Sequence, residues 1–343
     1  MNKKLLATLC ACSLTVTIGA CSSASSSSNT TEAVVSSASS VSETSVSANS
    51  TDLSNIALGI SFGQNVHPFF KAMQKGAQDA ANKHGVKLVV QSADSSVEKQ
   101  STQIENLAQS GVKAILVNPY DSAAVAPAIS EALNKKIGIF TMDITVIGAK
   151  ATSFIASDNV KIGTMLGEYI DKRLGGKGKV ALLDDPSVTS LKDRETGLTT
   201  YLKDHTQIKI VAKQTGAIER TKSLNAAEDI LQANPDINAF IGINENSALG
   251  IVSAIKSAGL QTKGIIVTGV DSTEDVMNGI KDGSIAIGVA QDPYQMGYQS
   301  VDNAIKWIKG ESISNEIKLD CEYMTKDNID KFFQREAAYN AKK

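Results

Sequence analysis

The stretch "NIALGISFGQNVHPFFKAMQKGAQDAANKHGVKLVVQSA", residues 55–93, contains one complete strand–helix–strand unit. "NIALGISF" and "KLVVQSA" are short apolar runs rich in β-branched residues. Between them, residues 68–84 have the apolar spacing of an amphipathic helix, and Gly85 follows as a helix stop. Two short strands joined by a helix are typical of a parallel sheet, so the stretch predicts an α/β fold.

The same alternation continues to the end of the chain. We expect further strands in "KAILVNP", "IGIFTMD", "ATSFIASDN", "KVALLDD", "IKIVAK", "NAFIGIN", "GIIVTGV" and "IAIGVAQ". We expect helices at 98–109, 123–133, 161–174, 191–203, 223–232 and 248–257. The pattern restarts after "ATSFIASDN", and the region is too long for one ordinary core. The sequence therefore predicts two Rossmann-like lobes with parallel sheets.

The N-terminus has the features of an export signal. Lys3 and Lys4 precede an apolar run that is shorter than the ~20 residues of a membrane-spanning helix, so residues 1–20 read as a signal peptide. "IGAC", residues 18–21, resembles a bacterial lipobox, which implies a lipid on Cys21; the alternative is an ordinary signal peptide with a chance cysteine. A diacylated Cys21 would anchor the protein to the outer side of the cytoplasmic membrane.

Residues 21–54 form the predicted tether. Nearly half of residues 22–54 are serine, and the segment has no apolar periodicity, so it cannot bury enough apolar surface to fold. A flexible coil of this length spans roughly 30 Å, which is enough to lift a folded domain off a membrane.

Cysteine usage and charge exclude several classes of protein. Cys321 alone remains after the signal and the lipid site, so no disulfide or cysteine-pair metal site is possible, and we expect it to be packed. Removal of the signal takes away Lys3 and Lys4 and moves the formal net charge from −2 to −4. No basic cluster with interleaved aromatics occurs, which argues against a nucleic-acid partner.

Enzyme motifs are also missing. The chain has no GxxxxGK[ST], GxSxG or HExxH, and its three histidines, His67, His84 and His205, fall on different elements. Asp184 and Asp185 are adjacent at a strand end, so their side chains point apart. This argues against their use as the paired carboxylates of a glycoside hydrolase. The alternating Asp and Asn ligands of a calcium loop are not found. We therefore expect no catalysis, no cofactor and no metal.

Polar residues follow the predicted strands. In open α/β sheets ligands bind beyond the carboxyl ends of the strands, so these residues are candidates for a site. Carboxylates and amides dominate the set, and their paired coplanar hydrogen-bonding atoms suit vicinal hydroxyls. Any one of them could instead be a helix cap or a turn. The set is Gln64–Phe70, Asn118–Asp121, Asp143, Asp184, Asp185, Asn244–Asn246, Asp271, Gln291 and Asp292.

These residues carry a family resemblance. From about Asn55 to Asn328 the chain resembles the ribose-type (type I) periplasmic sugar-binding proteins of ATP-driven transporters. The matching segments, in order, are "VHPFFKAMQKGAQ", "NPYDS", "TMDI", "IASDN", "DRETG", "INENSALG", "TGVDSTED" and "VAQDPYQMG".

The resemblance implies a ligand site. Sugars have flat C–H faces that aromatic rings bury, so Phe69 and Phe70 would lie against the ring, or pack in the core at a helix start. The residues implied to contact the ligand are His67, Phe69, Phe70, Asp143, Arg194, Asn244, Asp271 and Gln291. His67 would either donate to a hydroxyl or cap the helix that follows it.

Three positions differ from the ribose-binding pattern and bear on ligand specificity. Ribose binders carry Asn where this chain has His67, Arg where it has Ile144, and an aromatic residue where it has Ile218. A hydroxyl desolvated without its partner costs roughly 1 to 3 kcal/mol, so ribose should be penalised. Another pentose, a hexose, a deoxysugar or a polyol is expected.

The resemblance also implies a mechanism and partners. The lobes would comprise 55–157 with 292–320 and 158–291 with 321–343, joined by a three-segment hinge that closes on the ligand. We expect a monomer that delivers its sugar to a membrane permease.

A receptor for a furanosyl signalling molecule of the autoinducer-2 type, or a sugar co-receptor of a chemosensor, is the alternative. A sugar-responsive transcription regulator would need a DNA-binding segment before Asn55, where the signal and tether stand.

Overall fold

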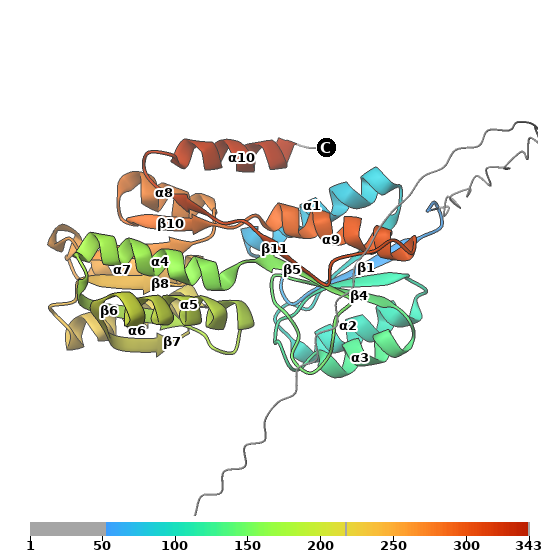
Figure 1. Cartoon of the computed structure of the whole chain (residues 1–343), viewed down its shortest axis with the longest axis horizontal. Coiled ribbons are helices and arrows are strands. Elements are labelled where there is room, and N and C mark those ends of the chain that lie inside the picture. The colour runs from blue at the N-terminus through green and yellow to red at the C-terminus, as the bar shows by residue number, and fades with distance from the viewer. Residues whose placement is uncertain (1–52, 217, 342–343) are drawn as a thin grey trace, which may run out of the picture. The chain divides into compact units, whose positions relative to one another are not determined.

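The computed structural model describes residues 53–216 and 218–341, which contain two six-stranded sheets (Figure 1). The first sheet has the order β11-β5-β4-β3-β1-β2, and all of its pairs are parallel. Its strands are β1 (Ala57–Phe62), β2 (Lys87–Ser92), β3 (Ala114–Asn118), β4 (Gly138–Met142), β5 (Ser153–Ser157) and β11 (Glu316–Leu319).

The second sheet has the order β12-β10-β9-β8-β6-β7. Its pairs are parallel except for β12, which runs antiparallel to β10. Its strands are β6 (Lys177–Asp184), β7 (Gln207–Thr215), β8 (Ala239–Gly242), β9 (Ile266–Val270), β10 (Ile287–Ala290) and β12 (Glu322–Met324). Except for β12, it repeats the strand arrangement of the first sheet, which confirms the predicted pair of Rossmann-like lobes.

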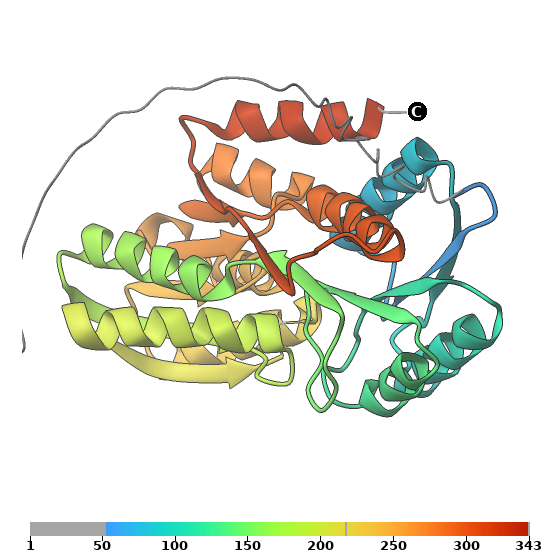
Figure 2. The ribbon, with the colours of Figure 1, turned by 45° about the vertical axis from the view of Figure 1, so that its right-hand side comes forward.

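Each sheet is covered on both faces. On the first sheet, α1 (Pro68–His84) and α9 (Pro293–Ile308) lie side by side on one face (Figure 2), while α2 (Val97–Gln109) and α3 (Ala126–Asn134) cover the other. On the second sheet, α4 (Asn159–Leu174) and α5 (Thr189–His205) cover one face. The other face is covered by α6 (Arg220–Ala233), α7 (Glu245–Ser257), α8 (Glu274–Asp282) and α10 (Ile329–Ala341), with the short helix η1 (Gln261–Lys263) in the connection before β9.

The burial of the strands explains their composition. β3, β4, β8 and β9 are buried along their whole length, because helices cover both of their sides. A parallel strand buried on both faces reads as a continuous apolar run, which is the pattern seen in the sequence. Four apolar clusters result, one on each face of each sheet.

Helix boundaries differ from those predicted at their N-terminal ends. Five helices begin one to three residues earlier than expected: α2, α4, α5, α6 and α7. In α5, α6 and α7 the added residues are all polar and carry no apolar signal. Helix α3 instead begins at Ala126, later than the predicted residue 123. There the Asp121 carboxylate accepts hydrogen bonds from the N–H groups of Ala123 and Ala124, both at 2.8 Å, and forms a turn before the helix.

The chain passes between the two sheets three times. It leaves β5 and enters α4 at Asp158, leaves β10 and enters α9 through Gln291 and Asp292, and leaves β11 and enters β12 through Asp320 and Cys321. These three connections lie at the lobe boundaries expected from the sequence, and their role as a hinge stays a prediction. Cys321 is a buried free thiol, as expected.

The predicted signal peptide, Cys21 and nearly all of the tether lie outside the described residues. Among the residues that the structure does describe, no helix combines the length and the apolar character needed to span a bilayer.

Candidate functional site

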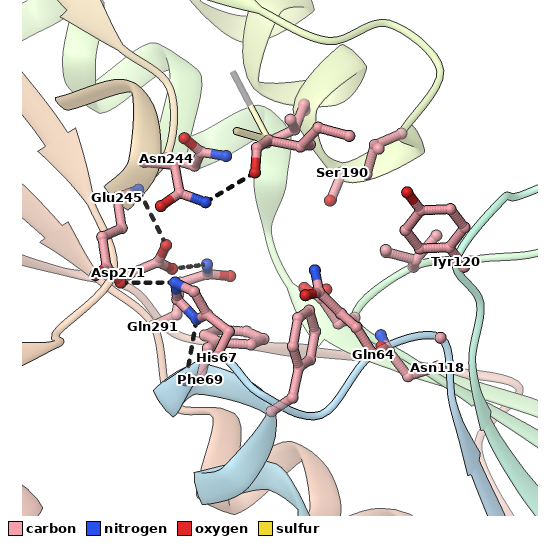
Figure 3. A pocket seen from close by; sticks show the side chains of 18 of the residues that line it. Gln64, His67, Phe69, Asn118, Tyr120, Ser190, Asn244, Glu245, Asp271 and Gln291 are labelled. Carbon is pink, nitrogen blue, oxygen red and sulfur yellow. Dashed lines mark hydrogen bonds and ion pairs between the residues drawn. The ribbon is translucent and has the colours of Figure 1, made fainter. Parts of the chain in front are cut away.

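One pocket collects side chains from the carboxyl ends of strands in both sheets (Figure 3). Its empty space is about 750 Å³, part of it open to solvent. The structure brings all of the ligand-contact residues predicted from the sequence into its lining: His67, Phe69, Phe70, Asp143, Arg194, Asn244, Asp271 and Gln291. They come from segments far apart in the sequence, so the topology of the two sheets assembles them.

The two phenylalanines begin α1 and have different surroundings. Their rings meet edge to face, with centroids 5.3 Å apart and an interplanar angle of 85°. Phe69 is buried and belongs to the apolar cluster beneath α1, while Phe70 is only partly buried. Both line the pocket, so Phe69 serves the core and the pocket wall together, and Phe70 offers the pocket more of its surface.

His67 caps α1. Its Nδ1 accepts a hydrogen bond from the backbone N–H of Phe69 at 3.2 Å, and its Nε2 lies 2.9 Å from Oε2 of Glu245 at the start of α7. Desolvation lowers the pKa of His67, but the hydrogen bond and charge of Glu245, with the charge of Asp271, outweigh it and raise the pKa above its usual 6.5. Of the two predicted roles, helix capping is present.

Asp143 and Asp271 hold equivalent places in the two lobes. Asp143 follows β4 and Asp271 follows β9, and their φ angles are 63° and 81°. Residues other than glycine rarely adopt a positive φ, and such strain concentrates at functional sites. Each backbone N–H donates to the neighbouring strand, at 2.8 Å to Ile155 O and 3.0 Å to Val289 O, which holds the side chain at the strand end.

The Asp143 carboxyl has an unusual environment. Its burial, with the negative charge of Asp271, raises the pKa to about 7, and the nearby charge of Arg194 and the amide of Asn118 only partly oppose this effect. Burial disfavours the charged form of a carboxyl group, and further hydrogen bonds to the carboxylate would favour it. The group is therefore poised to accept hydrogen bonds from a ligand.

Arg194 reaches the pocket from α5 and is buried, with 2% of its surface exposed. Its Nε donates to Asn159 Oδ1 at 2.8 Å and its Nη1 donates to Ile243 O at 2.9 Å, which fixes the guanidinium. Close packing of α4 on α5 makes this placement possible: a Cβ on Gly163 would lie 1.8 Å from the carbonyl oxygen of Arg194. Glycine is the residue that permits this approach.

The remaining two predicted residues are held by the second lobe. Asn244 caps α7, its Oδ1 accepting from the N–H of Ser247 at 2.9 Å, so its amide nitrogen is the group able to donate to a ligand. Gln291 Nε2 donates to Asp271 Oδ1 at 2.6 Å. Gln291 Oε1 is buried with no hydrogen-bond partner, which makes it a candidate acceptor for a ligand hydroxyl.

Two side chains of α10 hold the connection that contains Gln291. Arg335 Nη2 donates to Gln291 O at 2.9 Å and to Ser272 Oγ at 2.8 Å. Tyr339 donates to Asp292 Oδ2 at 2.7 Å, and its ring stacks on that of Tyr294, with centroids 4.0 Å apart. The connection between β10 and α9 is thus held at Gln291 and at Asp292.

Sequence reasoning missed part of the pocket. Val188, Ser190 and Leu191, at the start of α5, line it although they do not directly follow a strand. Figure 3 shows Ser190 and Tyr120 across the pocket from Asp271 and Gln291. Ser190 lies one helical turn before Arg194 and hence on the same helix face, a signal that could have identified it.

Seven members of the strand-end set do not line the pocket: Asn65, Val66, Pro68, Asp121, Asp184, Asp185 and Asp292. Asp184 is buried beside Lys213, with 3.0 Å between carboxylate oxygen and Nζ, and Asp185 accepts a hydrogen bond from the Ser187 hydroxyl at 2.6 Å. Asp185 thus has the turn role left open for single members of the set, whereas Asp184 pairs with Lys213 on the neighbouring strand β7.

The residues that depart from the ribose pattern do face the pocket. Ile144, beside Asp143, and Ile218 both line it, and Leu191 adds to this apolar surface. Within residues 53–216 and 218–341, no group of three or more His, Cys, Asp or Glu side chains is placed to hold a metal ion.

Comparison with known proteins agrees with this geometry. Residues 58–312 match the model of the periplasmic binding protein domain. The chain is 35% identical to ribose import binding protein RbsB of Escherichia coli over 282 residues, covering 82% of this chain and 94% of the relative. It is 33% identical to the Bacillus subtilis protein of the same name over 270 residues, covering 78% and 87%.

A solved structure is similar as well. The periplasmic solute-binding protein of an ABC transporter from Actinobacillus succinogenes, with bound D-allose, has a TM-score of 0.75 and 28% identity, covering 80% of this chain and 99% of that one. These relatives bind solutes for transport and are not enzymes. With its two parallel sheets, its cleft and these matches, the chain belongs to the type I periplasmic sugar-binding proteins of ABC transporters.

Proposed function

We propose that the protein captures a monosaccharide or a similar polyhydroxylated ligand in the cleft between its lobes and delivers it to an ABC transporter permease. The observation that carries this proposal is the convergence of two phenylalanines, two carboxylates, two amides and one arginine on a single pocket. This set combines an apolar surface for C–H groups with donors and acceptors for hydroxyls.

Each side chain has a role in the proposal. Phe69 and Phe70 cover one face of the sugar ring, and Arg194 donates to ring or hydroxyl oxygens. Asp143 and Gln291 Oε1 accept from hydroxyl groups. Asn244 donates through its amide nitrogen, and Asp271 takes a further hydroxyl.

The proposed ligand is not ribose, although the relatives named above are ribose import proteins. Both Ile144 and Ile218 line the pocket. By the resemblance to ribose binders, Ile144 takes the place of a hydrogen-bonding guanidinium and Ile218 that of a stacking ring. A ligand with an apolar substituent, such as a deoxysugar, or a hexose or polyol with a different pattern of hydroxyls, fits this lining better.

Closure of the lobes completes the proposed mechanism. We assign residues 55–157 with 292–320 to one lobe and 158–291 with 321–343 to the other. Ligand held by one lobe recruits the second, and the closed form presents a surface for the permease. In this proposal the protein is a monomer, exported by residues 1–20 and anchored outside the cytoplasmic membrane through lipidated Cys21, with residues 21–54 as a spacer.

A thermal-melt screen against pentoses, hexoses, deoxysugars and polyols tests the proposal. Ligand at 100 times its dissociation constant adds ~2.7 kcal/mol to the free energy of unfolding, which raises the melting temperature by several degrees. One selective stabiliser would support sugar capture, and a clearly smaller effect of the same sugar on Phe70→Ala would tie it to the cleft.

If no sugar in the screen raises the melting temperature of well-folded protein, a role in sugar uptake is refuted. The apolar lining by Ile144 and Ile218 then favours the second candidate, a receptor for a furanosyl signalling molecule of the autoinducer-2 type, whereas a sugar co-receptor of a chemosensor would still give a hit in the screen. Autoinducer-2 added to the same assay separates these outcomes.

A further inference from the structure

Both ring nitrogens of His67 have partners within the protein. Nδ1 accepts from the Phe69 N–H, so the ring proton is on Nε2, which faces Glu245 Oε2 at 2.9 Å (Figure 3). A neutral imidazole offers one donor and one acceptor, and both are engaged. His67 therefore has no ring nitrogen left for a ligand, although it lines the pocket.

Glu245 is fixed on the opposite wall. It is the first residue of α7, inside the capping box that Asn244 and Ser247 form. Its backbone N–H donates to Asp271 Oδ2 at 3.3 Å, and the positive end of the α7 dipole favours a carboxylate at this position. Its side chain has an exposed fraction of 9%, so water competes little for the carboxylate.

The two residues belong to different lobes. His67 precedes α1 on the first sheet, and Glu245 follows β8 of the second sheet. Another contact across the cleft, between Ser122 Oγ and Thr189 Oγ1, is 3.4 Å long and joins two neutral hydroxyls. A 2.9 Å contact between an imidazole nitrogen and a buried carboxylate is stronger than a long contact between two neutral hydroxyls, so the His67–Glu245 pair outweighs the Ser122–Thr189 contact.

We propose that His67 and Glu245 form a clasp between the lobes that favours closure whether or not ligand is bound, and that His67 is a closure residue that does not contact the ligand. The proposal rests on the hinge closure proposed above. Because the clasp uses protein groups alone, its energy shifts the open–closed equilibrium of the free protein. A larger closed fraction raises the apparent ligand affinity by the same factor while that fraction is small.

Two substitutions break the clasp and preserve the neighbouring structure. His67→Asn keeps a favoured capping residue before α1 but is too short to span the distance to Glu245. Glu245→Ala removes the carboxylate and keeps the backbone contact to Asp271. Glu274→Ala is the matched control, since Glu274 is also the first residue of its helix, α8, and is exposed.

Single-molecule energy transfer on the purified protein measures closure directly. Dyes are attached through unnatural amino acids at Asn134 on α3 and Lys203 on α5, both exposed and on different lobes. Without ligand, we expect a closed population in the wild type and in Glu274→Ala. It should fall at least threefold in His67→Asn and in Glu245→Ala, with no further fall in the double variant.

Unchanged distributions in both single variants, or additive losses in the double variant, would overturn the proposal. This readout needs no ligand, so a failed sugar screen leaves it intact. For any ligand that the screen identifies, affinity should fall by the same factor as the closed fraction. A loss of affinity with no change in closure would assign His67 to the ligand instead.

Discussion

The cleft holds two aspartates that share a backbone setting and differ in their surroundings. Asp143 and Asp271 each follow a parallel strand, each have a positive φ, and each are 6% exposed. Asp271 accepts from Gln291 Nε2 at 2.6 Å and from the Glu245 N–H at 3.3 Å. For Asp143, burial and the charge of Asp271 outweigh the Arg194 charge and the Asn118 amide and raise the pKa to about 7.

This difference separates two ways of using a carboxylate. Gln291 and Glu245, both in the second lobe, donate hydrogen bonds to Asp271. The Asp271 side chain is therefore fixed before any ligand arrives. The first lobe leaves Asp143 short of donors, so a ligand hydroxyl gains a strong acceptor. The free protein is less stable as a result, because ionising a desolvated carboxyl is unfavourable.

Replacement of each aspartate by asparagine should separate the two roles most strongly. Asn tolerates a positive φ, so the backbone is preserved. Asp143→Asn should weaken ligand binding by about 100-fold, since several charge-assisted hydrogen bonds of roughly 1.5–3 kcal/mol are at stake. The same change should raise the melting temperature of the free protein at pH 8 by removing a buried charge.

Asp271→Asn should also weaken binding but lower the melting temperature, because the donors from Gln291 and Glu245 lose their carboxylate. Fluorescence titration and thermal melts measure both effects. Melting temperatures that shift in the same direction would show that the two aspartates do not differ as described.

The phenylalanine pair gives the next largest effect. Phe70→Ala should lower affinity by about tenfold or more with little change in stability, since loss of an aromatic contact costs roughly 0.5–1.5 kcal/mol beyond its area. Phe69→Ala should lower both the ligand affinity and the free energy of unfolding, because truncating a buried phenylalanine costs about 3–5 kcal/mol of stability. If the free energy of unfolding falls equally in the two variants, then Phe70 is part of the core as well.

The pH dependence of binding follows from the pKa of Asp143, about 7. Ligand hydroxyls donate to the ionised form, so protonation competes with binding. We expect affinity to rise about tenfold between pH 6 and pH 8, with a plateau above it. Calorimetric titrations at several pH values measure this rise, which should vanish in Asp143→Asn.

The stability of the free protein should change in the opposite direction. The folded-state pKa of Asp143 lies above the unfolded value of 3.8, so its contribution to stability is complete below about pH 4 and is lost as pH rises through 7. Melting temperatures measured over this range should fall more steeply in the wild type than in Asp143→Asn. Parallel curves would contradict this assignment.

The smallest expected effect comes from Ile144→Arg, which gives Asp143 a charged donor beside it. We expect the pKa of Asp143 to fall, the rise in affinity between pH 6 and pH 8 to flatten, and ribose affinity to increase several-fold. Titration with ribose at pH 6 and pH 8 measures both. An unchanged ribose affinity would mean that Ile144 does not determine the exclusion of ribose.

The fold could be predicted because its signals are local. Strands such as β3 and β9 are buried on both faces and read as continuous apolar runs, and Gly85 ends α1 in the left-handed conformation that favours glycine. Helix starts were less accurate, because first turns such as that of α7 are built from polar caps.

The candidate site was predictable where its residues follow strands, as Asp143 and Asp271 do. The clasp between His67 and Glu245 was not, because it depends on how two separate lobes face each other, and no spacing in the sequence encodes that distance. Arg335 and Tyr339 likewise act through α10, which lies outside the matched family region of 58–312.

Calorimetric titration of the strongest ligand from the screen, into the wild type and Asp143→Asn at pH 8, tests the central claim most directly. We predict saturable one-to-one binding to the wild type, with the ligand recovered unchanged, and binding about 100-fold weaker to the variant. Equal affinity in the two proteins, or consumption of the ligand by pure protein, would contradict a sugar-binding cleft built around Asp143.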